Sequence, residues 1–173
     1  MRPVLLLAAS VLLIGAQDED ERVLRRSVVG GWTVSDVAPS DGGRLVELSR
    51  DGPGFSIRYY ANFWRGNGGE RRSALFSFSD CSSGDAETPV DPDRRGTPAD
   101  LRRQFGAYFA ECALSPRQQA AMLRGIDRAY CLFDRWAADA AADTANENAR
   151  IAAYGSDEAP RLVRPAPPSA SCR

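Results

Sequence analysis

Four acidic residues are the candidates for carboxylate chemistry in this chain, namely Asp36, Glu47, Asp80 and Glu111. A protonated and an ionised carboxyl group can together hydrolyse glycosidic bonds without histidine if they lie about 5–10 Å apart in a cleft. The pattern places the four residues in different elements, so only the fold can bring two of them together. A carboxylate-dependent hydrolase of glycan or peptidoglycan is therefore the alternative hypothesis.

The composition removes most other kinds of catalysis. The chain has no histidine, and all 22 of its basic residues are arginine. The absence of histidine excludes Ser–His–Asp and Cys–His catalysis, histidine metal sites and histidine pH switches. A serine nucleophile would need a histidine or lysine base, and the chain has neither. We therefore expect a protein that is not an enzyme, and the sequence indicates no cofactor.

An acidic loop expected between residues 80 and 96 is the candidate for metal binding. Its oxygen ligands would come from Asp80, Asp85, Glu87, Asp91 and Asp93. Calcium needs six to eight oxygen ligands, but the loop lacks the D-x-D-x-D-G spacing of an EF-hand. Prolines and two arginines interrupt the acids. An ordinary solvated loop is the preferred interpretation, so no metal site is predicted.

The four cysteines, Cys81, Cys112, Cys131 and Cys172, predict two disulfides. Their wide spacing contains no C-x₂₋₄-C pair of the kind that binds zinc. Four cysteines allow three pairings. Cys112 lies on the inward side of its expected helix and Cys131 on the outward side of the next, which favours the pairs Cys81–Cys112 and Cys131–Cys172.

The first 16 residues have the pattern of a secretory signal peptide. Arg2 precedes an apolar run, and the small residues Gly15 and Ala16 precede an acidic stretch. The run is shorter than the roughly 20 residues of a membrane span, so we expect cleavage after Ala16 and no membrane span in the mature chain. An uncleaved anchor is the alternative. With 22 basic and 23 acidic residues, the chain gives no indication of nucleic-acid binding. We expect a periplasmic or secreted protein, in a compartment where disulfides persist.

Alternating short runs separated by Gly, Pro and Asn predict a β-meander in the first half of the domain. The four expected strands are residues 31–37, 44–50, 55–64 and 71–79. Apolar residues take every second position of the third strand, from Phe55 to Phe63, so one face of the sheet needs a cover. Helical patterns over residues 98–113 and 115–148, each opening with a capping box and a proline, supply it.

The predicted fold is α+β: a four-stranded antiparallel β-meander followed by two amphipathic helices, the second long, stabilised by disulfides. The predicted organisation is a signal peptide (1–16), a flexible charged arm (17–27), one domain (28–154) and an extended Pro-rich tail (155–173). Four prolines keep the tail from being helical, and Cys172 is expected to tether it to the domain.

Two surfaces are candidates for binding. On the outer sheet face, Arg58, Tyr60 and Trp64 are residue types that anchor interfaces. A cover formed by the arm or the tail is the alternative for these aromatics. On the outer face of the long helix, a row of arginines could bind phosphate or carboxylate groups. The row is Arg117, Arg124, Arg128 and Arg135, and a solvated helix face is its alternative.

These observations together predict a non-enzymatic binding or accessory module of the cell envelope. Its partner would be an envelope protein or an anionic envelope component, and inhibition of an exported enzyme is one version of this role. Self-assembly through the sheet or the helix face remains open, and the sequence does not determine the oligomeric state.

Overall fold

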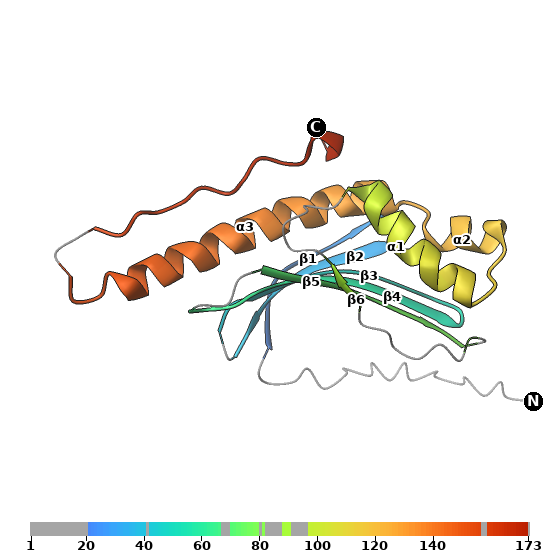
Figure 1. The fold of residues 1–173 in the computed structure, drawn as a ribbon, viewed down its shortest axis with the longest axis horizontal. Helices are drawn as coiled ribbons and strands as arrows, with labels where there is room; N and C mark the ends of the chain where they lie inside the picture. Colours follow the sequence, from blue (N-terminus) through green and yellow to red (C-terminus); the bar gives the residue numbers. More distant parts are fainter. Residues whose placement is uncertain are drawn as a thin grey trace, which may run out of the picture.

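A computed structural model describes residues 21–40, 42–66, 70–79, 81, 88–90, 97–156 and 159–172. Within them, an antiparallel sheet with strand order β1-β2-β3-β4-β5-β6 is followed by helices, so the predicted α+β class is confirmed (Figure 1). The strands are β1 (Glu21–Val29), β2 (Trp32–Pro39), β3 (Arg44–Gly52), β4 (Phe55–Phe63), β5 (Glu70–Phe78) and β6 (Thr88–Val90). The helices are α1 (Pro98–Glu111), α2 (Pro116–Met122) and α3 (Ile126–Ala152), and a 3₁₀ turn, η1 (Ala170–Cys172), lies near the C-terminus.

The prediction of four strands was wrong, because the described sheet has two more. The first, β1, takes up most of the segment that was expected to be a flexible arm, of which residues 17–20 lie outside the described part. Gly30 and Gly31, both with positive φ, form a two-residue hairpin that turns β1 onto β2. The second, β6, is a three-residue strand beside β5 in the segment expected to be a loop.

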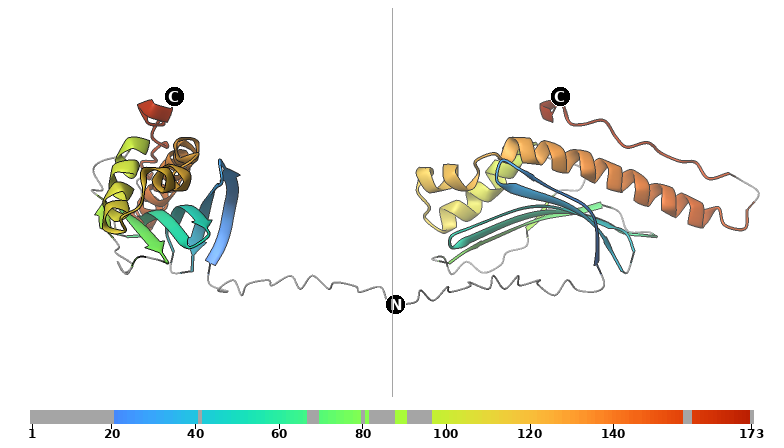
Figure 2. Two further views of the ribbon diagram at one scale, coloured as in Figure 1. Left: turned by 90° about the vertical axis from the view of Figure 1, so that its right-hand side faces the viewer. Right: turned by 180° about the vertical axis from the view of Figure 1, so that it is seen from behind.

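The helices cover one face of the curved sheet (Figure 2). Alternate residues of β4 are buried on that face, as the pattern predicted, and Ile57 and Ala61 are fully inaccessible. Aromatic rings join the layers: the ring centroids of Tyr59 and Phe133 are 5.1 Å apart, and those of Phe76 and Phe109 are 5.2 Å apart. The core therefore lies between the sheet and helices α1 and α3.

The prediction of a single helix from residue 115 to 148 was also wrong. The capping box of Ser115 and Gln118 is present, but the helix stops after Met122 and restarts at Ile126. Gly125, with φ +81°, forms the break. A Cβ atom at Gly125 would lie 2.4 Å from the carbonyl oxygen of Gly30, so the β1–β2 hairpin approaches the backbone here too closely for any side chain.

Replacing Gly125 with alanine is expected to lower the free energy of unfolding by about 2–3 kcal/mol, because left-handed strain of about 1–2 kcal/mol adds to the clash with Gly30. Urea denaturation followed by tryptophan fluorescence measures this loss. Gly155→Ala is the matched control, since Gly155 has the same φ of +81° but nothing within 4 Å of the added Cβ. Equal losses for the two variants would contradict the role of the close approach.

Two disulfides join Cys81 to Cys112 and Cys131 to Cys172, the pairing expected from the sequence. The first ties the segment after β5 to the end of α1. The second ties the C-terminal end of the tail to α3. Two disulfides are typical of proteins in oxidising compartments.

The tail, residues 159–172, runs extended back along α3 and ends beside the start of that helix (Figure 1). Asn146 holds it by accepting a hydrogen bond from the Val163 amide at 2.7 Å and donating one to the Val163 carbonyl at 3.0 Å. Nearer the C-terminus, the amide of Ser169 donates to Asp134 Oδ2 at 3.1 Å. The tail is thus fastened to α3 at both ends. In the described part of the chain, no helix has the length and hydropathy to cross a membrane.

Candidate functional site

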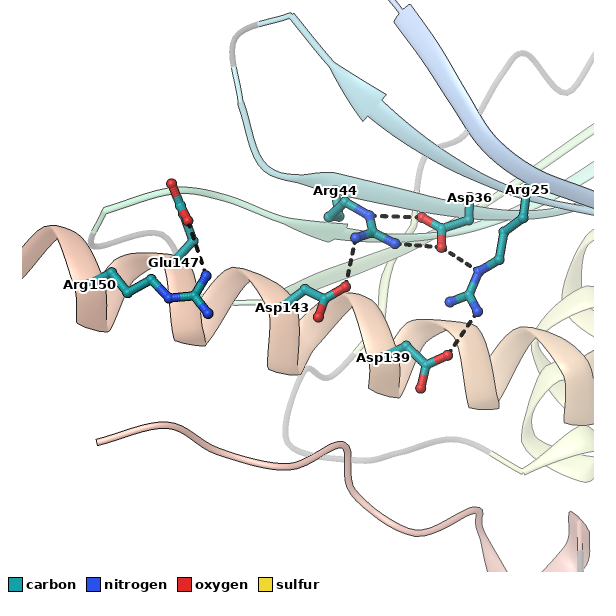
Figure 3. Close-up of polar contacts among 7 residues, drawn as sticks. All are labelled: Arg25, Asp36, Arg44, Asp139, Asp143, Glu147 and Arg150. Carbon is teal, nitrogen blue, oxygen red and sulfur yellow. Dashed lines mark hydrogen bonds and ion pairs between the residues drawn. The ribbon is translucent and has the colours of Figure 1, made fainter. Parts of the chain in front are cut away.

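A chain of ion pairs joins the sheet to α3. Asp36, fully buried on β2, accepts from Arg25 Nε at 2.7 Å and from Arg44 Nε and Nη2 at 2.9 and 2.6 Å (Figure 3). Each arginine also reaches an aspartate of α3: Arg25 Nη1 lies 2.9 Å from Asp139, and Arg44 Nη1 lies 2.9 Å from Asp143. We call these five residues the arginine–aspartate cluster.

The cluster is built to position elements rather than to react. Burial alone would lower the pKa of Arg44, but hydrogen bonds and the charges of Asp36 and Asp143 raise it above its ordinary value. Arg44 therefore stays charged. Both oxygens of Asp36 accept from guanidinium groups, so this carboxylate has no free position from which to attack a substrate. Its contacts lock strands β1–β3 to α3.

The four candidate carboxylates do not gather. Asp36 points towards α3, whereas Glu47 lies on the other face of the sheet, where its Oε1 is 3.2 Å from Arg58 Nε. Glu111 is exposed at the end of α1, and Asp80 lies outside the described residues. The described part of the chain thus offers no pair of these carboxylates in one cleft.

The other residues of the acidic loop, from Asp85 to Asp93, also lie outside the described residues. Among the residues that are described, no group of three or more Cys, Asp or Glu side chains is arranged to hold a metal ion.

The aromatic candidates on the sheet separate in the structure. Arg58 and Tyr60 lie on the face opposite α3, and Arg58 is engaged by Asp51 at 2.9 Å as well as by Glu47. Burial lowers the pKa of Arg58, but these carboxylates outweigh it and raise the pKa. Trp64 follows the end of β4 and lines a hollow together with residues of α3, including Thr144. Only two of the three residues therefore share the outer face.

The arginine row is divided by the break between α2 and α3. Arg117 lies on α2, and Arg124 lies in the turn, where its backbone carbonyl accepts from the indole of Trp32 at 2.9 Å. The sevenfold spacing survives only for Arg128 and Arg135, which are both exposed on α3. The predicted continuous row of four is therefore reduced to a pair.

The tail adds two arginines to this pair. Arg128 and Arg135 stand three residues before and four after Cys131, so they are its neighbours on the helix surface, where the tail is bonded. Arg161 and Arg164 are exposed on the tail. We call these four residues the α3–tail arginine surface. None of the four has an ion pair with a described acidic residue.

A buried arginine was missed by the sequence analysis. Arg72 on β5 is only 2% exposed, and its Nε donates to Glu70. Its guanidinium carbon is 6.0 Å from the ring centroid of Phe133. Burial opposes its charge, but Glu70 and the neighbouring tyrosines raise its pKa above the ordinary value. The alternation of Ala74 and Phe76 on the inner face already puts Arg72 on that face by parity, so the signal was present in the sequence.

Arg72 Nη1 is one of three buried side-chain atoms without a hydrogen-bond partner in the described part of the chain. A buried donor left unsatisfied costs about 1–3 kcal/mol, and more when it is charged. Such a group calls for an acceptor.

The fold and its two disulfides define a small disulfide-bonded α+β protein in which a curved antiparallel meander is covered on one face by helices. Comparisons with protein-family models, with curated proteins and with solved structures find no match for this chain.

Proposed function

We propose that this protein is an exported, non-enzymatic binding module that recognises an anionic component of the cell envelope through the α3–tail arginine surface. The segment with signal-peptide character and the two disulfides support export. The absence of histidine and lysine, and the separation of Asp36 from Glu47, favour binding over hydrolysis.

The distribution of charge carries the proposal. The whole chain is nearly neutral, with 22 arginines against 23 acids. The described residues alone contain 18 arginines against 12 acids, a net charge of +6. Many arginines of this part are already neutralised: Arg25 and Arg44 in the arginine–aspartate cluster, and Arg58 by Asp51. The excess positive charge is concentrated in arginines without such partners, which include the α3–tail arginine surface.

The chemistry of these side chains suits phosphate and carboxylate groups. A guanidinium group offers two parallel N–H donors to such an anion. Arg128 and Arg135 are seven residues apart, which corresponds to about 10 Å along a helix. This spacing fits successive anionic groups on a polymer or a membrane surface better than one small ion. The disulfide at Cys131 holds the tail arginines beside them.

The double variant Arg128→Glu/Arg135→Glu is expected to weaken binding to phosphatidylglycerol-containing vesicles at least tenfold at low salt, because each basic residue near such a surface contributes about 1 kcal/mol. Vesicle co-sedimentation measures the affinity, with phosphatidylcholine vesicles as the neutral reference.

The variant Arg22→Glu/Arg26→Glu is the matched control. It makes the same change of net charge on exposed residues of β1, and it should retain most of the binding. Equal losses in the two variants would show that net charge alone matters. Failure of the unaltered protein to bind anionic vesicles would remove the lipid form of the proposal, and capture of envelope polyanions would then test the other.

A further inference from the structure

We infer that the protein also has a small-molecule site, in which Arg72 binds the carboxylate of a short-chain monocarboxylic acid beneath the tail. This site is separate from the α3–tail arginine surface in its ligand and its size, and it does not depend on the proposed envelope binding. It lies in a pocket of about 280 Å³ between β5, α3 and the tail. We call it the tail pocket; its main lining residues are Glu70, Arg72, Ala138, Ala141, Ala142 and Arg164.

The anchor of the site is the buried guanidinium group. Arg72 is 98% buried and lines the pocket, and its Nη1 has no hydrogen-bond partner among the described residues. Its Nε is already engaged by Glu70. Buried N–H groups in proteins nearly always find an acceptor. A carboxylate oxygen in the pocket would supply that acceptor and would also compensate the buried positive charge.

The walls limit the ligand to a monoanion with a short apolar part. Glu70 lies beside Arg72 and would repel a dianion such as phosphate, whereas a single negative charge gains from Arg72 and from Arg164 on the tail side. The helix contributes only alanine methyl groups to the wall, which favour an aliphatic chain. The volume is just below the range of about 300–1,000 Å³ typical of ligand pockets, so it suits a chain of a few carbons.

The tail forms the roof of the pocket. Val163, Arg164 and Ala166 line it from above. The hydrogen bonds of Val163 with Asn146 lie at one end of this roof, and the Cys131–Cys172 disulfide lies beyond the other end. The roof is therefore held in place without filling the space below it.

The test is a titration of the oxidised, exported protein with butyrate, followed by amide chemical shifts in NMR spectra. Butyramide, which has nearly the same shape but no charge, is the reference ligand, and inorganic phosphate is the dianionic one. We expect butyrate to bind at millimolar concentration with shifts in the Ala138–Ala142 segment, and both other probes to bind at least tenfold more weakly.

Two variants keep the test sharp. Ala141→Leu fills the pocket without changing charge and is expected to weaken butyrate binding at least tenfold, whereas Ala120→Leu on the exposed side of α2 should leave it unchanged. Arg72→Gln should abolish the preference for butyrate over butyramide if the variant folds. No shift with butyrate, which would mean that the pocket holds only water, would overturn the inference. So would equal binding of butyramide, or unchanged binding in Ala141→Leu.

Discussion

Replacing Asp36 with alanine is expected to lower the free energy of unfolding by about 3–5 kcal/mol, one of the largest effects of any single substitution in this protein. Asp36 is fully buried and accepts three hydrogen bonds from Arg25 and Arg44. Its removal leaves two guanidinium groups between the sheet and α3 without their shared carboxylate, and breaking a buried pair from one side has a cost of this size. Urea denaturation at neutral pH measures the loss.

The matched control for this prediction is Asp51→Ala. Asp51 also pairs with an arginine, at 2.9 Å, but its side chain is 66% exposed, so the loss should stay below about 1 kcal/mol. The double variant Asp36→Leu/Arg44→Met should be more stable than Asp36→Ala, because it removes a charge that the single variant leaves without its partner. A loss below 1 kcal/mol for Asp36→Ala would contradict the assigned role of the arginine–aspartate cluster.

The second large effect is expected for the disulfides, which should contribute unequally. They close loops of similar length, with sequence separations of 31 and 41, for which the chain-entropy model gives ~4 kcal/mol each. The variant Cys81→Ser/Cys112→Ser should lose about 3–4 kcal/mol, because Cys112 lies at the end of α1, whose side chains belong to the core. The variant Cys131→Ser/Cys172→Ser should lose less than about 1.5 kcal/mol. Its tail, exposed from residue 159 to 167, can detach while the core stays folded, so the native state recovers most of the lost entropy.

Denaturation curves of the two double variants, recorded beside the oxidised protein, test this difference. Trypsin adds an independent measurement, because release of the tail should speed cleavage after Arg161 in the Cys131→Ser/Cys172→Ser variant while the rest of the chain stays resistant. Similar losses of stability in both variants would mean that the tail is part of the cooperative unit.

The tail connects the two proposals. It contributes arginines to the α3–tail arginine surface and forms the roof of the tail pocket. The tail-free variant Cys131→Ser/Cys172→Ser therefore provides a common check: it should weaken vesicle binding moderately, because Arg128 and Arg135 remain on α3, and it should weaken butyrate binding more strongly, because the pocket loses its roof.

Local signals in the sequence were sufficient for several features. The helix starts at Pro98 and Pro116 follow from capping boxes that any chain with these residues would form. The buried face of β4 follows from its period of two. The cysteine pairing followed from the faces on which Cys112 and Cys131 lie. These features depend on residues within a few positions of one another, which is the range over which a sequence pattern is informative.

The features that were missed depend on contacts between distant segments. The charged segment of β1 reads as a flexible arm until Asp36 and Asp139 compensate Arg25. The helix pattern across Gly125 is continuous, and only the approach of the β1–β2 hairpin makes the break favourable.

The sequence by itself therefore determined the class of fold, the disulfide pairing and the kinds of chemistry that are absent. The tertiary structure alone decided where charges are compensated: it neutralised Arg25, Arg44 and Arg58, left Arg128 and Arg135 exposed beside the tail, and buried Arg72 with an unpaired donor. The reason is physical, because the effect of a charge depends on its distance from other charges and from solvent, and both distances are set by segments that are remote in the chain.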